Sequence, residues 1–393
     1  MPFRSKRPRL SFITFFSLAA IAFLGACVAS VPSGSNTGLR INASEPVEVA
    51  LLVPGGSLAE ADNFLATNLE NAARLAIADL DGVEIDLRVY NTGADAQQAA
   101  QAARQAVNEG AKIILGPLYA EAANAAGVAV ASRNVNVMAF SNNTSIAGGN
   151  VFILGQTFLN TANRLVRFAT ATGSSNYMIL HGDDLQGAFG RDAIETAIRR
   201  NGSTIASIES YPLSQQAIVD RAPEIVEMAD LTFTDTIFLT AGVNADLPIV
   251  ATVLPERGLS TESIRYIGLT RWDAAPQLLA LPALQGGLFA VPDAQMSGLF
   301  EARYNAAFGS SPHPLAGLAY DGIAAIGALV ATGQSDALTA ASLTQPQGFQ
   351  GTSGIFRFLP DGTNERGLAV ASVENNQVVI LDPAPRSFGR AGF

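Results

Sequence analysis

Residues 112–144 decide the fold, and they read KIILGPLYA (112–120), EAANAAGVAVASR (121–133) and NVNVMAFSNNT (134–144). An apolar run ending in Gly-Pro, an alanine-rich helical segment and a second apolar run predict a strand, a helix and a strand. A crossover of this length forces the two strands to be parallel, so both end at one edge of the sheet. Ligands bind at that edge in open α/β folds, so we expect Leu118, Tyr119 and residues 141–144 to lie there together.

The same alternation of apolar runs and helical segments continues on both sides of this unit. An apolar run at Val47–Val53 opens the series, and a second series of the same kind follows Gly155 and extends to Pro292. Alternating strands and helices build parallel sheets that helices cover on both faces. We therefore expect an α/β protein with two doubly wound parallel-sheet lobes, followed by further helical segments and a late series of hairpin strands.

The composition is that of a folded, acidic protein. The chain has 393 residues, of which 48% are hydrophobic and 15% charged, enough for two domains with ordinary cores. The formal net charge is −10, and the first 26 residues carry four cations and no acid, so the remainder is more acidic still. No basic stripe remains to neutralise phosphates, which argues against nucleic acid as a partner.

The N-terminus resembles a bacterial lipoprotein signal. Met1–Arg9 carries four cations, Leu10–Leu24 is apolar but short for a membrane span, and Leu24-Gly25-Ala26-Cys27 follows as a lipobox. The resemblance implies cleavage of residues 1–26, acylation of Cys27 and a lipid tether to the membrane outside the cytoplasm. The alternative is an uncleaved membrane anchor with a buried cysteine.

Cys27 is also the single cysteine of the chain, so an exported protein would have no internal disulfide. Residues 27–46 are rich in Pro, Ser, Gly, Asn and Thr and predict a flexible tether. Val28 is not the aspartate that favours inner-membrane retention in the lipoproteins this segment resembles. We therefore expect a place in the cell envelope, on the periplasmic face of the outer membrane rather than on the inner membrane.

The order of elements from Val47 to Pro383 resembles the type I periplasmic binding fold of leucine-binding and related solute-receptor proteins. The motifs that carry the resemblance are Gly116-Pro117, residues 136–144 with their Ser-Asn-Asn-Thr end, Gly182-Asp183-Asp184 with Gly187, Tyr320-Asp321, and GTSGIFRF at 351–358. The resemblance implies two lobes joined by a three-strand hinge. It places residues 47–155 and 293–343 in lobe I and residues 156–292 and 350–383 in lobe II.

Within that family, two segments resemble the lipoprotein branch that includes the penicillin-binding protein activator. These are VYNTG at 89–93 and ILGPL at 114–118. The chain also departs from the solute receptors after Pro54. Their first turn is usually followed by a second glycine early in the first helix, whereas Asn63–Asn68 contains no glycine here. This favours a non-enzymatic adaptor that activates a peptidoglycan synthase. The alternative is an ABC-transporter solute-binding lipoprotein for amino acids or related small molecules.

Polar residues stand where helices should begin after the strands of the first lobe, and helix N-termini attract carboxylates. The predicted cleft residues of this lobe, for a ligand or a partner, are Ser57, Leu118, Tyr119, Ser141, Asn142, Asn143 and Thr144. The alternative for the polar residues is that they only cap their own helices, and for Tyr119 that it packs at the rim.

The second lobe contributes an acid and an Arg-Trp-Asp sequence to the predicted cleft. Asp184 or its neighbour Asp183 could bind an ammonium group. Arg271, Trp272 and Asp273 place a cation, the single tryptophan and an acid together after a strand. The alternative is that Trp272 packs within the lobe while Arg271 and Asp273 form a surface ion pair.

Enzyme motifs are absent from the sequence. It contains no G-x-S-x-G, P-loop, H-E-x-x-H or G-x-G-x-x-G, and its two histidines, His181 and His313, are too few and too far apart for a metal cluster. Neighbouring acids such as Asp183 and Asp184 are typical of a solvated loop. We therefore expect no catalytic residue, no metal and no cofactor.

Overall fold

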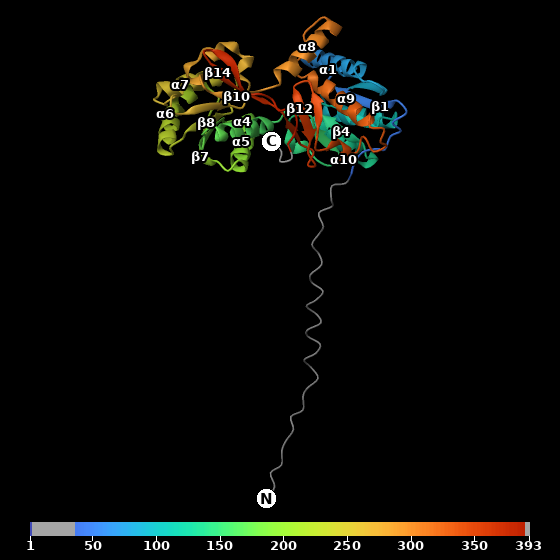
Figure 1. The fold of residues 1–393 in the computed structure, drawn as a ribbon, viewed down its shortest axis with the longest axis horizontal. Coiled ribbons are helices and arrows are strands. Elements are labelled where there is room, and N and C mark those ends of the chain that lie inside the picture. The colour runs from blue at the N-terminus through green and yellow to red at the C-terminus, as the bar shows by residue number, and fades with distance from the viewer. Residues whose placement is uncertain (2–35, 390–393) are drawn as a thin grey trace. The chain divides into compact units, whose positions relative to one another are not determined.

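The computed structural model describes Met1 and residues 36–389 (Figure 1). The predicted signal peptide beyond Met1, the lipidation site Cys27 and residues 28–35 of the predicted tether lie outside the described residues. Asn36–Phe393 form one compact unit by themselves. None of the helices within residues 36–389 is long and apolar enough to cross a membrane.

Lobe I is built on a five-stranded parallel sheet in the order β2-β1-β3-β4-β5. The strands are β1 (Val47–Val53), β2 (Ile85–Asn91), β3 (Ile113–Leu115), β4 (Asn136–Ala139) and β5 (Val151–Ile153). The helices are α1 (Glu60–Ala78), α2 (Ala96–Asn108), α3 (Ala120–Val130), α8 (Ala294–Phe308), α9 (Gly317–Val330) and α10 (Ala340–Leu343).

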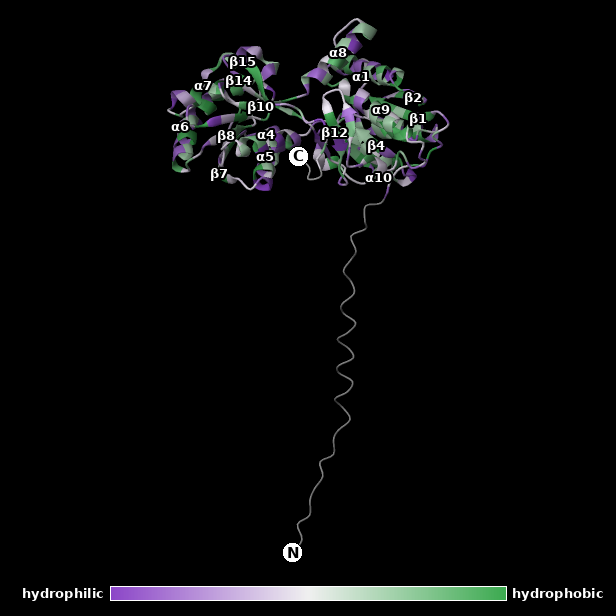
Figure 2. Cartoon of the chain, in the orientation of Figure 1, coloured by the Kyte–Doolittle hydropathy of each residue, from purple (hydrophilic) through white to green (hydrophobic). Residues whose placement is uncertain are grey.

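Helices cover both faces of this sheet, which explains why β3 and β5 are apolar throughout and β1 nearly so, whereas the edge strand β2 alternates apolar and polar residues. Successive side chains of a strand point to opposite faces, so Val49 and Leu51 pack with α1 and α9, whereas Ala50 and Leu52 pack with α2 and α3. Figure 2 shows the same concentration of hydrophobic residues along the strands. The expected doubly wound arrangement of the first lobe is confirmed.

Lobe II is built on a seven-stranded sheet in the order β15-β14-β10-β9-β8-β6-β7. Its strands are β6 (Asn176–Gly182), β7 (Thr204–Tyr211), β8 (Thr236–Leu239), β9 (Arg265–Gly268), β10 (Leu288–Val291), β14 (Ala369–Glu374) and β15 (Gln377–Asp382), and its helices are α4 (Phe158–Ala171), α5 (Leu185–Arg200), α6 (Gln215–Leu231) and α7 (Leu247–Glu256). Strands β6 to β10 are parallel, and β14 and β15 extend the sheet as an antiparallel pair. Helices α6 and α7 cover one face, and α4 and α5 cover the other.

A small antiparallel sheet of β11 (Phe349–Gly351), β12 (Gly354–Phe358) and β13 (Asn364–Arg366) differs from the prediction. The sequence analysis assigned residues 350–383 to lobe II, but Phe349, Phe356 and Phe358 are buried in the core of lobe I. The N–H of Ile153 in β5 also donates a hydrogen bond to the carbonyl of Gly362 (2.7 Å). Only the last part of the predicted range, β14 and β15, joins lobe II.

The chain passes between the lobes at residues 154–157, 292–293 and 367–368. The number of crossings is the expected one, but the third lies at 367–368 and not between residues 343 and 350, because the small sheet packs on lobe I. The first crossing leads directly into α4 through a capping box. The Thr157 hydroxyl accepts the N–H of Asn160 (3.2 Å), and the Asn160 side chain accepts the N–H of Thr157 (2.9 Å). These reciprocal bonds fix the point at which the chain enters lobe II.

The described part of the predicted flexible tether differs from the prediction. Ile41 is buried in the core of lobe I, and its N–H donates a hydrogen bond to the carbonyl of Ser335 (2.8 Å). The side-chain amide of Asn136 donates to the carbonyl of Thr37 (3.1 Å). Residues 36–46 therefore pack against lobe I, because Ile41 supplies an apolar side chain that its core can bury.

Candidate ligand-binding cleft

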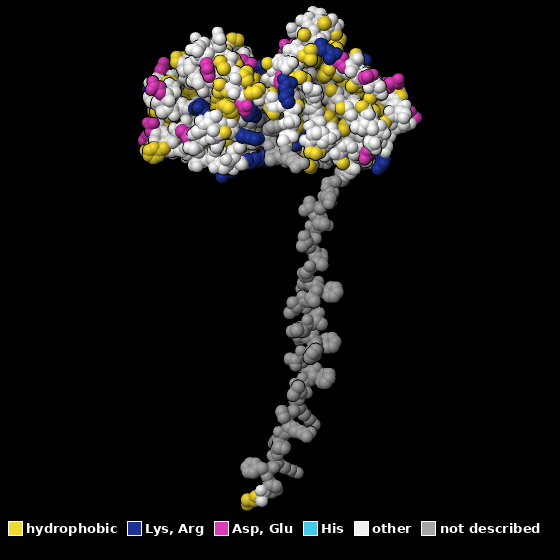
Figure 3. Space-filling view, viewed as in Figure 1, with side chains coloured by type: hydrophobic (Ala, Val, Ile, Leu, Met, Phe, Trp, Pro, Cys, Tyr) yellow, Lys and Arg dark blue, Asp and Glu magenta, His cyan; other side chains and the backbone are white. Residues whose placement is uncertain are grey.

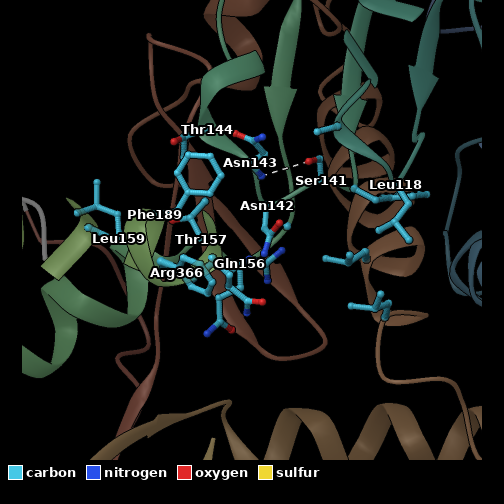
Figure 4. Close-up of a pocket in the computed structure, with 18 of the residues that line it drawn as sticks. Leu118, Ser141, Asn142, Asn143, Thr144, Gln156, Thr157, Leu159, Phe189 and Arg366 are labelled. Carbon is cyan, nitrogen blue, oxygen red and sulfur yellow. Dashed lines mark hydrogen bonds between the residues drawn. The ribbon is translucent and has the colours of Figure 1, made fainter. Parts of the chain in front are cut away.

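A cleft of about 1190 Å³ lies between the two lobes. Figure 3 shows the surface hollowed between the lobes, and Figure 4 shows part of the lining. Of the predicted site residues, the cleft is lined by Leu118, Tyr119, Ser141, Asn142, Asn143, Thr144, Asp184 and Arg271. The volume exceeds the roughly 300–1,000 Å³ of typical ligand pockets, which indicates that the lobes stand apart in this structure.

The polar wall of lobe I is the loop that follows β4, residues 141–144 (Figure 4). Ser141 is buried, and its hydroxyl accepts the N–H of Asn143 (3.1 Å). The Asn143 side chain in turn accepts the N–H of Ser145 (2.9 Å) and caps the short 3₁₀ helix at Thr144–Ile146. Asn143 thus caps its own short helix, as the capping alternative has it, whereas Ser141 holds the loop that precedes this helix.

Asn142 and Thr144 belong to the same loop but are exposed in the cleft. Neither side chain makes a hydrogen bond within the part of the chain that the structure describes. An amide and a hydroxyl thus face the cleft with their hydrogen-bonding capacity available to a ligand.

The apolar part of this wall comes from Leu118 and Tyr119, at the start of α3. Tyr119 is 42% exposed, and its hydroxyl donates a hydrogen bond to Asp62 (2.5 Å). That bond, together with partial burial, raises the pKa of Tyr119. Because Asp62 already holds the hydroxyl, the ring is the part of Tyr119 that remains for a cleft ligand.

Lobe II contributes Asp184, which is the N-cap of α5. One carboxylate oxygen accepts the N–H of Gly187 (2.7 Å). Gly187 packs so closely that a Cβ there would lie 2.1 Å from the carbonyl oxygen of Gly182. The turn therefore holds Asp184 in place and leaves its second carboxylate oxygen for a donor in the cleft.

Arg271 lines the cleft but is paired with a neighbour. Its guanidinium donates to both carboxylate oxygens of Asp273 (3.1 and 2.6 Å), and this hydrogen bonding raises the pKa of Arg271. Asp273 itself does not line the cleft. The predicted surface ion pair is present, and it partly neutralises the cation that faces the cleft.

Two further predicted site residues lie outside the cleft lining. Trp272 is fully buried in the core of lobe II, where its ring packs on Phe289 with the centroids 5.5 Å apart. The 3₁₀ helix Trp272–Ala274 directs the indole beneath the sheet, onto the faces of Gly268 and Gly287. Ser57 lies in the turn after β1, where its hydroxyl accepts the N–H of Ala59 (3.1 Å). The predicted cleft roles of Trp272, Asp273 and Ser57 are therefore not supported by the structure.

A buried ion pair at the cleft was not predicted. Arg366 of β13 and Asp321 of α9 both line the cleft, although their side chains are only 3% and 1% exposed, and their nearest charged atoms are 3.3 Å apart. Burial raises the pKa of Asp321, whereas the Arg366 guanidinium and the N–H of Thr352 (2.6 Å) act to lower it. The signal available in the sequence was a single charge, Asp321, within the otherwise uncharged segment 315–332.

Sequence reasoning also missed the apolar wall of lobe II. Leu185 and Phe189, both on α5, line the cleft and are 71% and 48% exposed. Large apolar side chains with such exposure, in a cleft that also holds polar groups, are typical of a ligand-binding or closing surface. Their spacing of four residues places them on one face of α5.

The described residues contain no group of three or more His, Cys, Asp or Glu side chains that could hold a metal ion. His313 belongs to lobe I, where its ring packs edge-on against Phe64. His181 is buried at the end of β6, and one of its ring nitrogens is 2.8 Å from the carbonyl oxygen of Gly182. The two histidines therefore have separate structural surroundings.

The fold is shared with solved transport proteins. The structure resembles a Rhodospirillum rubrum protein assigned to branched-chain amino acid ABC transport (TM-score 0.73, 18% identity, 86% of this chain and 100% of that chain). It also resembles a branched-chain amino acid ABC transporter ligand-binding protein from Burkholderia xenovorans (0.67, 16%, 87% and 96%). A third similar structure is an ABC transporter substrate-binding protein from Desulfitobacterium hafniense in complex with Leu (0.62, 17%, 86% and 100%).

Sequence comparison gives one curated relative and a family. An uncharacterised protein of Rickettsia prowazekii (strain Madrid E) is 21% identical over 262 residues, which cover 67% of this chain and 62% of that protein. The chain thus spans about three fifths of that relative's length. The family model described as periplasmic binding protein matches residues 46–377. The match covers both lobes, and the chain belongs to the periplasmic binding protein family, in its type I, leucine-binding-like form.

Proposed function

We propose that the protein is a solute-binding protein of an ABC transporter, and that its interlobe cleft binds a small amino-acid-like molecule. The observation that carries this proposal is the cleft itself, in which polar loop ends of lobe I face an acid and apolar side chains of lobe II. The similar structures, which include a complex with Leu, support the same choice. They favour the solute-binding alternative over the peptidoglycan-synthase adaptor that the sequence motifs had placed first.

The lining suggests how such a ligand would be held. Asn142, Thr144 and the backbone of their loop would donate hydrogen bonds to a carboxylate. The second oxygen of Asp184 would accept a hydrogen bond from an ammonium group, in a charge-assisted bond. Tyr119 and Phe189 would cover an apolar side chain. Closure of the lobes would then remove the ligand from water and bring both sets of contacts together.

We further propose that the chain works in the cell envelope, anchored by a lipid on Cys27. This rests on the order of cationic, apolar and small residues at the N-terminus. A lipid anchor would keep a solute-binding protein close to a membrane transporter, and it would equally suit an adaptor. The choice between the inner and the outer membrane rests on Val28 alone.

The test is a binding screen of residues 36–393 against free L-amino acids, related carboxylates and peptidoglycan fragments. A ligand that binds only the folded state raises the melting temperature. Any ligand found is then titrated against the Asp184→Asn variant, because asparagine caps a helix about as well as aspartate but carries no charge. Asp220→Asn, on the exposed side of α6, is the matched control.

For a ligand with an ammonium group, we expect Asp184→Asn to weaken binding while Asp220→Asn leaves it unchanged. Equal affinity of the two variants for the ligand would show that Asp184 does not bind its ammonium group. Failure of every small molecule to bind, together with recovery of the protein in a complex with a peptidoglycan synthase of its own envelope, would favour the adaptor.

A further inference from the structure

The C-terminal segment makes a fourth connection between the lobes. It comprises residues 384–389, which follow β15 of lobe II, and we call it the strap. Ala384, at its start, is 7% exposed and belongs to the core of lobe II. From this point the strap leaves its own sheet and returns toward lobe I, as the contacts of the next residues show.

The middle of the strap lies against two of the three crossings. Pro385 packs on Gly367 of the third crossing, where an added Cβ would lie 3.1 Å from the proline ring. The Arg386 guanidinium donates to the side chain of Gln295 (2.9 Å) and pairs with Asp293 (3.4 Å). Asp293 belongs to the second crossing and caps α8, so this contact joins the strap to the entry into lobe I.

The end of the strap is held on the small sheet of lobe I. The Arg357 guanidinium of β12 lies 4.6 Å from the centroid of the Phe388 ring. Gly348 admits the same ring, because a Cβ there would lie 2.8 Å from it. The Arg357 guanidinium donates hydrogen bonds to Glu365 (2.6 Å) and to the carbonyl of Pro346 (3.0 Å), which hold it under the Phe388 ring.

We propose that this strap is a releasable brace that limits rotation of the lobes about the hinge. It is covalently continuous with lobe II, and the side chains of Arg386 and Phe388 hold it on lobe I. Its two ends belong to different lobes, so a rotation of lobe II that moves these ends apart stretches or detaches the strap. The Arg386 side chain is 58% exposed, whereas its partner Asp293 is 8% exposed and Arg357, under the Phe388 ring, is 12% exposed. An ion pair with one exposed member and a single cation–π contact are each weak, so detachment of the strap is accessible to thermal motion.

The brace should narrow the range of interlobe distances in the ligand-free protein. The equilibrium between open and closed lobes would then depend on whether the strap is attached, and the apparent affinity of a cleft ligand would depend on the same equilibrium. This inference concerns the hinge and does not depend on the identity of the ligand, nor on the protein's being a transporter component.

The test measures interlobe distances by electron paramagnetic resonance in residues 36–393, which contain no cysteine. Spin labels are attached at Arg104→Cys on α2 and Glu227→Cys on α6, both exposed positions on different lobes. The labelled protein is compared with the same protein carrying Arg386→Ala and Phe388→Ala. Its matched control carries Arg199→Ala and Phe233→Ala, an exposed arginine and an exposed phenylalanine of lobe II.

We expect the strap variant to give a broader distance distribution than both the unsubstituted protein and the control, without any ligand present. Arg386→Ala alone, which removes a largely exposed side chain, should give a smaller broadening with an unchanged melting temperature. Distributions of equal width in all four proteins would overturn the proposal. Failure of the solute-binding proposal would leave this readout unaffected, so the two outcomes are distinguishable.

Discussion

Arg366 and Asp321 form an ion pair at the floor of the cleft, with Nη1 and Oδ2 3.3 Å apart. The same guanidinium donates to the carbonyl of Leu154, at the first crossing, and to the hydroxyl of Ser353 (3.1 Å). The carbonyl of Ser353 accepts the N–H of Asp293 (2.9 Å), at the second crossing. One buried cation thus connects α9, β13 and the backbone at two of the three crossings, close to where a ligand would lie.

Removal of one member of this pair should be costly, because a buried charge would be left without its partner. We expect Arg366→Met to lower the free energy of unfolding by about 3–5 kcal/mol. The double variant Arg366→Met with Asp321→Leu should lose less than the sum of the two single variants, since no charge then remains. Urea denaturation of all four proteins measures this coupling. Additive losses would show that the pair is not energetically connected.

The loop after β4 should matter for binding more than for folding. Replacement of both Ser141 and Thr144 by alanine should weaken the binding of any cleft ligand, because the Thr144 hydroxyl that faces the cleft is lost. The fold should lose only about 0.5–1.5 kcal/mol, since the Ser141 hydroxyl accepts one hydrogen bond and the Thr144 hydroxyl makes none within the described residues. Titration calorimetry checks the affinity. Ser57→Ala, a polar residue outside the cleft, is the control, and equal affinity in both variants would leave the two residues as structural parts of the loop.

Much of the fold and the rim of the cleft could be predicted from the sequence, because local pattern decides them. Strand β1 is apolar on both faces from Val49 to Val53, and that pattern predicts a parallel sheet covered by helices on both sides. The loop after β4 must lie at the same edge as the loop after β3, because both strands are parallel neighbours. That relation alone placed Leu118 and Ser141 in one cleft.

The remainder depends on contacts between distant residues. Arg366 and Asp321 are 45 positions apart, and they meet only because the small sheet joins lobe I. Trp272 follows a strand as the rim residues do, but a 3₁₀ turn directs it beneath the sheet. The strap has no periodic pattern that would predict its return to lobe I. Residue spacing in the sequence cannot predict these contacts, because they depend on how the elements pack in three dimensions.

The buried position of Trp272 predicts that changes around it affect stability alone. Gly268→Ala would place a Cβ 2.2 Å from the indole nitrogen, and we expect overpacking to cost about 1–3 kcal/mol. Binding in the cleft should be unchanged at temperatures where the variant remains folded. Thermal unfolding followed by a ligand titration measures both quantities. A weaker affinity for the cleft ligand, without a loss of unfolding free energy, would show that Trp272 contributes to ligand binding.

Stability should fall on acidification through His313. Burial lowers the pKa of this imidazole, and its Nδ1 accepts the N–H of Leu315 (3.1 Å), which requires the neutral ring. The unfolded chain binds a proton near its ordinary pKa of about 6.5, before the folded protein does. The contribution of His313 to the free energy of unfolding is therefore complete above the pKa of the unfolded chain. It is lost as the pH falls through the lowered pKa of the folded protein.

The measurement for His313 is a series of urea denaturations between about pH 8 and pH 5, with wild type and His313→Gln compared at each pH. Carboxylates that titrate in the same range affect both proteins and cancel in the difference. We expect the difference in unfolding free energy to shrink as the pH falls. A difference that stays constant with pH would contradict the assignment.

Processing at the N-terminus is tested by Cys27→Ser. If Cys27 is acylated after cleavage of the signal, the serine variant should receive no lipid and should accumulate as a precursor that retains residues 1–26. Mass spectrometry of the membrane fraction distinguishes the precursor from the mature lipoprotein. A serine variant that is cleaved and membrane-bound as the wild type is would exclude the lipobox.

The most direct test of the proposed function combines ligand binding with a measurement of shape. Residues 36–393 are titrated with the amino acid that gives the largest thermal shift, and small-angle X-ray scattering is recorded with and without it. Because a ligand that touches both walls of the cleft favours the closed arrangement, we predict a smaller radius of gyration when it is bound. Tight binding without any compaction, or no binding of any amino acid or related carboxylate, would contradict a solute-binding role for the cleft.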